Sequence, residues 1–417
     1  MRESVILPRP RRKICFVIDK LAGRSGGAER ILIGTANGLA ARGHEVQILT
    51  HEPRGIPPFY PLAPGVIHTN LRRPKAVRNR IRRKIDAIRD SLHARYKTPP
   101  FPADHLLWTS KYGAFWRRLE THLAAHQPDV AIAFLPPAIT ALGRARPSPG
   151  LRRIASLHNV PEQDYRNPAR WDPSPLDRAR RWAGLEACDA VTVLLPEFRQ
   201  WFPEELRRRI SIMPNPVPPV PSSRIRSHGR DRTVLSVGRL APVKRQDLLI
   251  DAWAELVERF PDWTLKIFGI GPDQEKLAAR VRELGLEDKV LLMGHTDAIG
   301  EEYLTAGILC HPAEYEGWGL AVTEALAAGL VPVGFADCPG VNQLIEDGRT
   351  GVLVDPGPGS REARVHALAE ALCDLMADPE RRTRLGMAGP ASMCDFAPDR
   401  VIDLWEDLLY TEAGARP

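Results

Sequence analysis

The chain has 417 residues, 43% of them hydrophobic, which is too many residues for one ordinary core and enough apolar side chains to fill two domains. Its six cysteines are scattered without a CxxC pair, so neither a disulfide framework nor a zinc site is expected. No run of about 20 apolar residues is free of charge, and the N-terminus carries no secretory signal. We therefore expect a cytoplasmic protein without a membrane-spanning helix.

In the first half of the chain, short apolar runs alternate with helical patterns. The runs are "KICFVID" (13–19), "HEVQILT" (44–50), "DVAIAF" (129–134), "RIASLHN" (153–159) and "AVTVLLP" (190–196), and a helix is expected at about 29–41. This alternation predicts parallel strands that are buried on both faces of a sheet.

Two features of this half are candidates for a site. The loop "DKLAGRSGGAERIL" (19–32) lacks the GxGxxG spacing, and no acidic residue ends the next run, which argues against a dehydrogenase. A loop that closes over a phosphate or a sugar through Gly26 and Gly27 is the interpretation left open. His158 ends the run 153–159 and is either a structural residue or part of a site.

Most of the positive charge lies in one segment. Residues 72–97 contain eleven Lys and Arg against two Asp, a local balance of +9, whereas the whole chain carries +7. The apolar residues from Val77 to Tyr96 recur every three or four positions, the stripe of an amphipathic helix. Its basic residues are either a solvated face or a contact to an anionic partner.

A segment rich in proline, serine and charge, 214–231, separates the two halves and predicts an interdomain linker, because proline cannot join a central strand. After it the alternation resumes with "TVLSVGRL" (233–240), "WTLKIFGIGP" (263–272), "KVLLMGH" (289–295), "GILCHPA" (307–313) and "VPVGFA" (331–336). The fold class is therefore α/β, with two Rossmann-like doubly wound parallel-sheet domains that face each other across a ligand-binding cleft.

The run 233–240 ends in a cationic motif. Gly238 and Arg239 follow the apolar residues directly, and Lys244 comes five residues after the arginine. Two cations at the carboxyl end of a buried strand are placed to clamp a diphosphate, because arginine binds phosphate bidentately and lysine adds a point charge. The alternative is a solvated loop with incidental charge.

The stretch "EGWGLAVTE" (316–324) holds two carboxylates around a predicted helix start. Glycines let the backbone approach a ligand closely, and a helix N-terminus presents free N–H groups to a phosphate. Glu316 and Glu324 are about 12 Å apart along a helix axis, so they would read different hydroxyl groups. The structural alternatives are a helix-dipole partner for Glu316 and a surface charge for Glu324.

Together, these elements resemble the family 4 retaining glycosyltransferases of the GT-B fold. The resemblance rests on the strand-end Gly238, Arg239 and Lys244, on the E-x7-E pair, and on "GGAER", "PNPV" and "CPGVNQLIEDGRTGVLV" (338–354). Trp318 stands where the family more often has phenylalanine, and the basic insertion at 72–97 is not shared by most members.

The resemblance implies a role for each matching residue. Arg239 and Lys244 would neutralise the departing diphosphate, Glu316 would hold hydroxyls of the donor sugar, and Glu324 would bind the ribose diol. His158 would lie beside the donor sugar. The residues expected at the donor site are Gly26, Gly27, Gly238, Arg239, Lys244, Glu316, Gly317, Trp318, Gly319, Leu320 and Glu324, with Glu316, His158, Arg239 and Lys244 as the catalytic set. No cofactor and no metal is expected, since cations and a helix N-terminus can stabilise the leaving group.

The expected domains are an acceptor-binding domain at 1–215 with the basic insertion, a linker at 216–231, a donor-binding domain at 232–395 and a C-terminal helix at 396–417 that packs back toward the first domain.

The expected activity is transfer of a hexose or N-acetylhexosamine, from a UDP-sugar rather than a GDP-sugar, to a lipid-linked or membrane-associated glycan in surface polysaccharide or lipopolysaccharide assembly. A related subgroup with a comparable basic helix favours a lipid carrier. The residues expected to hold the acceptor or the anionic inner face of the cytoplasmic membrane are Arg78, Arg80, Arg82, Arg83 and Lys84. Two alternatives stay open: a transferase to a soluble sugar or sugar phosphate, and a nonenzymatic peripheral membrane protein. Nucleic acid is not expected as a partner, because aromatic residues do not interleave the basic ones.

Overall fold

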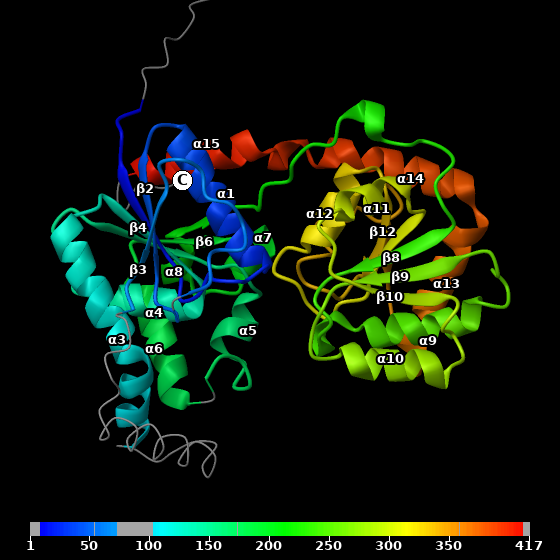
Figure 1. Ribbon diagram of the computed structural model, residues 1–417, viewed down its shortest axis with the longest axis horizontal. Helices are drawn as coiled ribbons and strands as arrows, with labels where there is room; N and C mark the ends of the chain where they lie inside the picture. The colour runs from blue at the N-terminus through cyan, green and yellow to red at the C-terminus, as the bar shows by residue number, and fades with distance from the viewer. Residues whose placement is uncertain (1–8, 54, 73–102, 173, 358, 412–417) are drawn as a thin grey trace, which may run out of the picture. The chain divides into compact units, whose positions relative to one another are not determined.

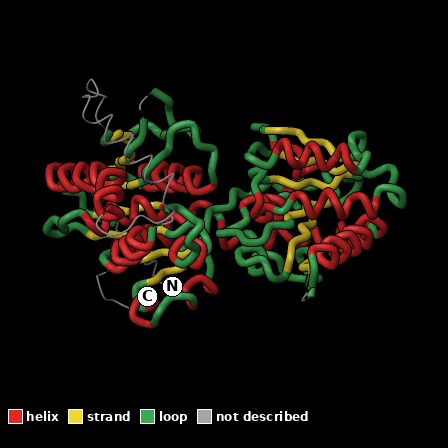
Figure 2. The backbone as a smooth tube through the Cα atoms, turned by 90° about the horizontal axis from the view of Figure 1, so that it is seen from below, coloured by secondary structure: helices red, strands yellow, loops and turns green. Residues whose placement is uncertain are grey.

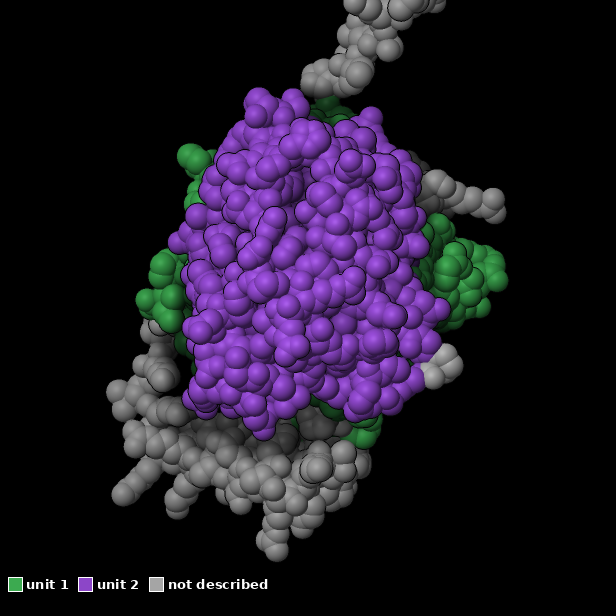
Figure 3. Space-filling model, turned by 90° about the vertical axis from the view of Figure 1, so that its right-hand side faces the viewer, with its two compact units in different colours: residues 1–214, 401–417 green, residues 215–400 purple. Residues whose placement is uncertain are grey.

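The computed structural model describes residues 9–53, 55–72, 103–172, 174–357 and 359–411, and the chain forms two compact units. Unit 1 consists of Met1–Pro214 with Val401–Pro417, and unit 2 consists of Asn215–Arg400. Figure 3 colours unit 1 green and unit 2 purple. Each unit is a sheet with helices on both faces, as the yellow strands and red helices of Figure 2 show.

The sheet of unit 1 has seven strands in the order β3-β2-β1-β4-β5-β6-β7, and each pairs in parallel with its neighbours. The strands are β1 Lys13–Val17, β2 Glu45–Thr50, β3 Ile67–Asn70, β4 Val130–Phe134, β5 Arg152–Ser156, β6 Ala190–Val193 and β7 Ile210–Ile212. The central strands β4 and β6 are buried at every residue. This burial follows from their apolar sequences, since a parallel strand covered by helices on both faces has no solvent side.

The helices of unit 1 are divided between the two faces of the sheet, with α3, α4 and α6 on one face and α1 and α15 on the other (Figure 1). The helices are α1 Gly27–Ala41, α3 Ala103–His126, α4 Leu135–Arg144, α5 Pro161–Tyr165, α6 Pro175–Glu186, α7 Pro196–Gln200, α8 Glu204–Arg207 and α15 Pro398–Tyr410. Ser174 caps α6 through its hydroxyl, which accepts from the amides of Leu176 and Asp177.

Two glycines let α4 and α6 cross at backbone contact. A Cβ on Gly184 would lie 2.8 Å from the Cα of Thr140, and a Cβ on Gly143 would lie 2.3 Å from the carbonyl oxygen of Gly184. Both distances are too short for any side chain, so glycine is required at this crossing.

The sheet of unit 2 has six strands in the order β10-β9-β8-β11-β12-β13, again parallel. The strands are β8 Thr233–Val237, β9 Thr264–Phe268, β10 Val290–Gly294, β11 Ile308–His311, β12 Val331–Phe335 and β13 Val352–Val354. The helices are η1 Ser222–Arg224, η2 Pro242–Lys244, α9 Gln246–Leu256, α10 Gln274–Glu283, α11 Ile299–Thr305, α12 Leu320–Ala327, α13 Arg361–Ala377, α14 Pro379–Ser392 and η3 Cys394–Phe396. The strand order places β8 beside β11, which are far apart in the sequence. The prediction of two parallel α/β sheets is confirmed.

Residues 216–231, expected as a linker, cluster with unit 2. The guanidinium of Arg230 donates hydrogen bonds to the carbonyl oxygens of Tyr303, Ala306 and Ala328. Arg224 forms an ion pair with Glu301 at 2.7 Å. These contacts attach the proline-rich segment to the second sheet's own helices.

The C-terminal helix α15 returns the chain to unit 1. Trp405 is only 1% exposed and stacks near Phe134 of β4. The carboxylate of Glu406 contacts His44 at 3.1 Å and Arg42 at 3.3 Å. The last helix is therefore part of the core of unit 1.

The basic residues Arg78, Arg80, Arg82, Arg83 and Lys84 lie outside the described residues. Within the described part of the chain, no helix is long and apolar enough to cross a membrane.

Candidate functional site

The carboxyl ends of β8 and β9 meet through glycines. The amide of Gly238 donates to the carbonyl oxygen of Phe268 at 3.0 Å. A Cβ on Gly269 would lie 1.9 Å from the carbonyl oxygen of Gly238, and a Cβ on Gly271 would lie 2.1 Å from that of Leu240. The loops after the two strands are thus pressed together. Arg239, in the first of these loops, is exposed at this edge of the sheet.

Three polar side chains converge next to this edge: Lys244 of η2, His311 at the end of β11, and Glu316. The ammonium of Lys244 and the Nε2 of His311 both contact Oε1 of Glu316, the latter at 2.9 Å. The three side chains are 19%, 4% and 15% exposed, in that order. The parallel pairing of β8 and β11 brings them together, because the carboxyl ends of neighbouring parallel strands lie at the same edge.

Burial sets the protonation of the two bases in this cluster. Burial lowers the pKa of Lys244 to about 8 against an opposing effect of Cys338, and the charge of Arg239 makes a smaller contribution in the same direction as burial. Burial and the charge of Lys244 lower the pKa of His311 to about 3. His311 is therefore neutral at physiological pH. Because a carboxylate can only accept, the Nε2–H of His311 donates to Glu316.

The backbone on both sides of Glu316 is fixed by neighbouring loops. Its amide donates to the carbonyl oxygen of Pro339 at 2.9 Å, and the amide of Glu314 donates to that of Val243, also at 2.9 Å. Gly340 has a φ of 87°, and a Cβ there would lie 2.1 Å from the carbonyl oxygen of Glu316. The loop after β12 therefore holds Glu316 in place.

Helix α12 begins behind this loop. Gly319 adopts a left-handed conformation with a φ of 68° and precedes the first helical residue, Leu320, so the expected helix start is found. Trp318 is 3% exposed and packs edge-on against Phe396, with ring centroids 5.1 Å apart. The Trp318 side chain is thus a packing element, so at this position the side chain is turned away from a ligand.

Glu324 lies in the second turn of α12. Its Oε2 accepts a hydrogen bond from the hydroxyl of Tyr303 at 3.0 Å. Tyr303 is 2% exposed, so this contact anchors one oxygen of the carboxylate to α11.

In unit 1, the glycine loop precedes α1. The carboxylate of Glu29 folds back over Gly26, because its Oε2 would be only 2.2 Å from a Cβ there. Glu29 is 6% exposed and pairs with Arg24 at 3.8 Å. The backbone at Gly26 and Gly27 is open to a close approach, but the position at which an anion would meet the helix is taken by the protein's own carboxylate.

His158 follows β5, at the same edge of the sheet as Gly26. Its ring stacks on Phe134 with centroids 4.3 Å apart. Its Nε2 contacts the hydroxyl of Ser156 at 2.9 Å, and that hydroxyl in turn accepts from Thr192. Burial lowers the pKa of His158 to about 3. The imidazole is therefore neutral and fixed in orientation.

An open depression lies at the carboxyl ends of β2 and β3. It is lined by Glu52, Gly55, Ile56, His68, Thr69 and Asn70. Oε2 of Glu52 accepts from the amides of Leu21 and Ala22, both at 2.9 Å, which ties the depression to the loop after β1.

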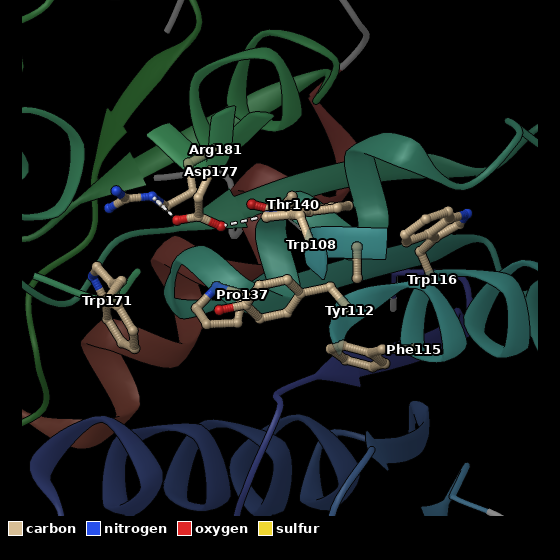
Figure 4. Close-up of a pocket in the computed structure, with 10 residues that line it drawn as sticks. Trp108, Tyr112, Phe115, Trp116, Pro137, Thr140, Trp171, Asp177 and Arg181 are labelled. Carbon is tan, nitrogen blue, oxygen red and sulfur yellow. Dashed lines mark hydrogen bonds and ion pairs between the residues drawn. The ribbon is translucent and has the colours of Figure 1, made fainter. Parts of the chain in front are cut away.

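A second, small pocket lies between α3, α4 and α6 (Figure 4). The indole N–H of Trp108 donates to Asp177 at 2.7 Å, and Asp177 pairs with Arg181 at 2.8 Å. The faces of Trp108 are already covered, since Arg180 lies 3.9 Å and Arg144 lies 5.4 Å from its ring centroid. We assign this pocket to helix packing.

The structure thus brings together Gly238, Arg239, Lys244 and Glu316 within unit 2, with Glu324 on the helix behind them. His158, Gly26 and Gly27 are in unit 1. His311 was not among the residues predicted from sequence. Its signal is its position, five residues before Glu316 at the end of a predicted strand.

Known proteins resemble the chain over most of its length. A family model described as "Glycosyltransferase Family 4" matches residues 25–220, and one described as "Glycosyl transferases group 1" matches residues 222–391. An exopolysaccharide phosphotransferase of Streptomyces coelicolor is 28% identical over 97% of this chain, although the chain spans only 41% of that relative. A D-inositol 3-phosphate glycosyltransferase of Nocardia farcinica is 26% identical over 94% of this chain and 87% of the relative.

Solved structures share the fold at low identity. Sucrose-phosphate synthase from Thermosynechococcus elongatus superposes with a TM-score of 0.73 at 20% identity, covering 95% of this chain and 98% of that one. TarM superposes with a TM-score of 0.73 at 13% identity, covering 97% and 100%. Because the two family models adjoin and together match nearly all of residues 25–391, the chain belongs to glycosyltransferase family 4 and has the GT-B fold.

Proposed function

We propose that the protein transfers a hexose or N-acetylhexosamine, with retention, from a UDP-sugar to a lipid-linked or membrane-associated glycan in surface polysaccharide or lipopolysaccharide assembly. The observation that carries the proposal is the cluster of Lys244, His311 and Glu316 beside Gly238 and Arg239. Two cationic side chains that could bind a diphosphate and a carboxylate that could accept hydrogen bonds from sugar hydroxyls lie at the same edge of one sheet.

In this proposal the leaving diphosphate is stabilised by fixed charges. Arg239 and Lys244 supply two cations, and the first amides of α12 supply N–H groups at a helix N-terminus. Such preorganised donors act where negative charge develops in the transition state. We propose that these groups make a divalent metal unnecessary. Within the described residues, no group of His, Cys, Asp and Glu is arranged to hold a metal ion.

The sugar-reading roles follow from the chemistry of the side chains. Glu316 is acceptor-only when ionised and would bind hydroxyls of the donor sugar, while Glu324 would bind the ribose diol. His158 would lie beside the donor sugar. Gly26 and Gly27 would let the backbone approach the phosphates once the Glu29 carboxylate moves away from Gly26. The departing diphosphate oxygen would take the proton of the acceptor hydroxyl.

The choice of UDP is supported by a structural neighbour. HepE of Anabaena, crystallised with UDP-glucose, superposes with a TM-score of 0.68 at 18% identity, covering 96% of this chain and 99% of that one. The proposed inner-membrane location and the lipid carrier are supported by the basic residues at 72–97. The open depression at β3 adjoins the start of that segment at Arg72 and is the proposed place for the acceptor glycan.

A soluble sugar phosphate is the second candidate acceptor. The similarity to D-inositol 3-phosphate glycosyltransferase over 94% of this chain favours it. The two acceptors share the proposed donor site and differ in their need for the basic segment.

The test is nucleoside diphosphate release by purified protein in EDTA, with a panel of UDP- and GDP-sugars. The acceptors are a short-chain polyprenyl-diphosphate sugar and a soluble sugar phosphate. We expect acceptor-dependent release that Glu316→Ala lowers by about 100-fold or more. Glu314→Ala, which removes an exposed carboxylate two residues away, should keep wild-type release. No release by the wild type with any donor and acceptor would contradict the proposal.

The membrane part has its own test. Reversal of the charge at Arg78, Arg80, Arg82 and Arg83 should abolish sedimentation with anionic liposomes and weaken turnover of the lipid acceptor, while soluble-acceptor turnover is unchanged. Full lipid-acceptor turnover in that variant would exclude a role for the basic segment.

A further inference from the structure

His311 is a buried polar residue to which no role has been given so far. It ends β11, is 3% exposed, and its Nε2 lies 2.9 Å from Oε1 of Glu316. Lys244 contacts the same oxygen. Neither contact uses Oε2 of Glu316.

We propose that His311 is a positioning residue that holds the Glu316 carboxylate in its sugar-binding orientation while Lys244 engages the donor diphosphate. The inference rests on the proposed function and gives His311 the role of keeping Glu316 in place for sugar recognition.

Lys244 has two anionic partners in this proposal, the Glu316 carboxylate and the donor diphosphate. Its single positive charge is paired with Glu316, and the same ammonium is one of two cations beside the proposed diphosphate position. When a diphosphate approaches, the ammonium is shared between two anions, and its hold on Glu316 weakens. A carboxylate that is only 15% exposed then needs another donor, because a buried charge without hydrogen bonds is costly.

His311 meets that need better than a second cation would. Its imidazole is neutral, so the negatively charged diphosphate does not draw it away from Glu316 as it would a second cation. Burial keeps its pKa far below physiological pH, so the hydrogen bond does not change with protonation in that range. The strand end is rigid, since β11 pairs with β8 on one side and β12 on the other.

The backbone contacts of Glu316 do not make His311 redundant. Pro339 and Gly340 fix the main chain, but the carboxylate can still rotate about its side-chain bonds. Among the described residues, the two donors to the Glu316 carboxylate are Lys244 and His311. Removal of His311 therefore leaves the orientation of the carboxylate to Lys244 alone.

The test compares UDP with UDP-sugar in wild type, His311→Leu and His311→Gln. Leucine removes the donor at similar size, whereas the glutamine amide can still donate to Glu316. In calorimetry, both variants should bind UDP with an affinity within about twofold of that of the wild type, because UDP lacks the sugar. We expect His311→Leu to lose the extra affinity for the UDP-sugar and to lower kcat/KM by about tenfold or more, and His311→Gln to restore most of both.

A double-mutant cycle separates positioning from general damage. In a Glu316→Ala background, His311→Leu should cause no further loss of kcat/KM, because the residue acts through the carboxylate. Additive losses of kcat/KM, an equal weakening of UDP and UDP-sugar binding in His311→Leu, or no rescue by glutamine would each overturn the inference.

If wild type bound and transferred no nucleotide sugar at all, the proposed function itself would fail, which is a distinguishable result. Should the leucine variant fail to fold, full sugar-dependent affinity loss in His311→Gln would also contradict the inference.

Discussion

The burial of the Lys244 side chain determines the pH range in which it carries a positive charge. In the unfolded chain its pKa would be near 10.5, and in the folded protein burial lowers it to about 8. Between these two values the unfolded chain binds more protons than the folded one, so this group makes stability rise with pH across that window. The positive charge that we propose for diphosphate binding is lost over the same range.

The affinity for UDP should therefore fall as the pH rises above about 8. If one proton on Lys244 is required, the Kd should increase by up to about tenfold per pH unit until the pKa of the complex is reached. Isothermal titration calorimetry from pH 6.5 to 10 would measure this. Lys244→Arg is the control, because guanidinium stays charged across the range and should flatten the profile. A wild-type profile that is flat to pH 10 would show that Lys244 does not supply the charge.

The sequence predicted candidate donor-site residues but not the contacts between their side chains. Glu316, Lys244 and Arg239 were predicted from motif spacing, whereas His311 was missed. Its place five residues before Glu316 can be read from the sequence, but whether the two side chains meet depends on how the chain turns between them.

At the scale of elements, the crossing of α4 and α6 is the tightest helix contact described here. Gly184 lies in the last turn of α6, where glycine costs at most about 1 kcal/mol relative to alanine. An added Cβ there would meet the Cα of Thr140 at 2.8 Å. The steric cost of separating two packed helices is about 1–3 kcal/mol. The gain in helix propensity is therefore offset or exceeded.

We expect Gly184→Ala to lower the thermal unfolding midpoint or leave it unchanged, and Gly34→Ala to raise it. Gly34 is the control, since it lies within α1 and has nothing within 4 Å of the added Cβ. That substitution should stabilise the protein by about 1 kcal/mol. Differential scanning calorimetry would measure the unfolding midpoint of both variants. An equal rise in both midpoints would refute the close crossing.

At the scale of the whole molecule, the chain leaves unit 1 before residue 215 and returns to it in α15. Trp405 and Leu404 are neighbours on that helix with opposite environments, at 1% and 39% exposed. Glu406 adds contacts to His44 and Arg42. The stability of unit 1 therefore depends on residues from both ends of the sequence.

Trp405→Ala should destabilise unit 1 by about 3–5 kcal/mol, the usual cost of truncating a buried aromatic residue. Leu404→Ala should cost less than about 1 kcal/mol. In calorimetry we expect the tryptophan variant to move the transition of unit 1 to lower temperature and to leave that of unit 2 near its wild-type position. Equal effects of the two substitutions would mean that α15 is not part of the core of unit 1.

The sequence by itself determined the fold class, the alternation of strands and helices, and the glycosyltransferase motifs. These are local properties: a parallel strand covered on both faces must be apolar along its length, and "PDRVIDLWEDLLY" forms the helix Pro398–Tyr410 because its apolar residues share one face. Glycine, the two cations and the two carboxylates are recognisable because their spacing along the chain is fixed.

Only the tertiary structure decided which side chains meet. The sheet order sets β8 beside β11 and so brings Lys244 to His311 and Glu316. The tertiary structure also decided that Trp318 packs against Phe396. Such contacts join residues up to 78 positions apart, for Trp318 and Phe396, and no local pattern encodes them, because strand order and loop packing depend on the free energy of the whole folded unit.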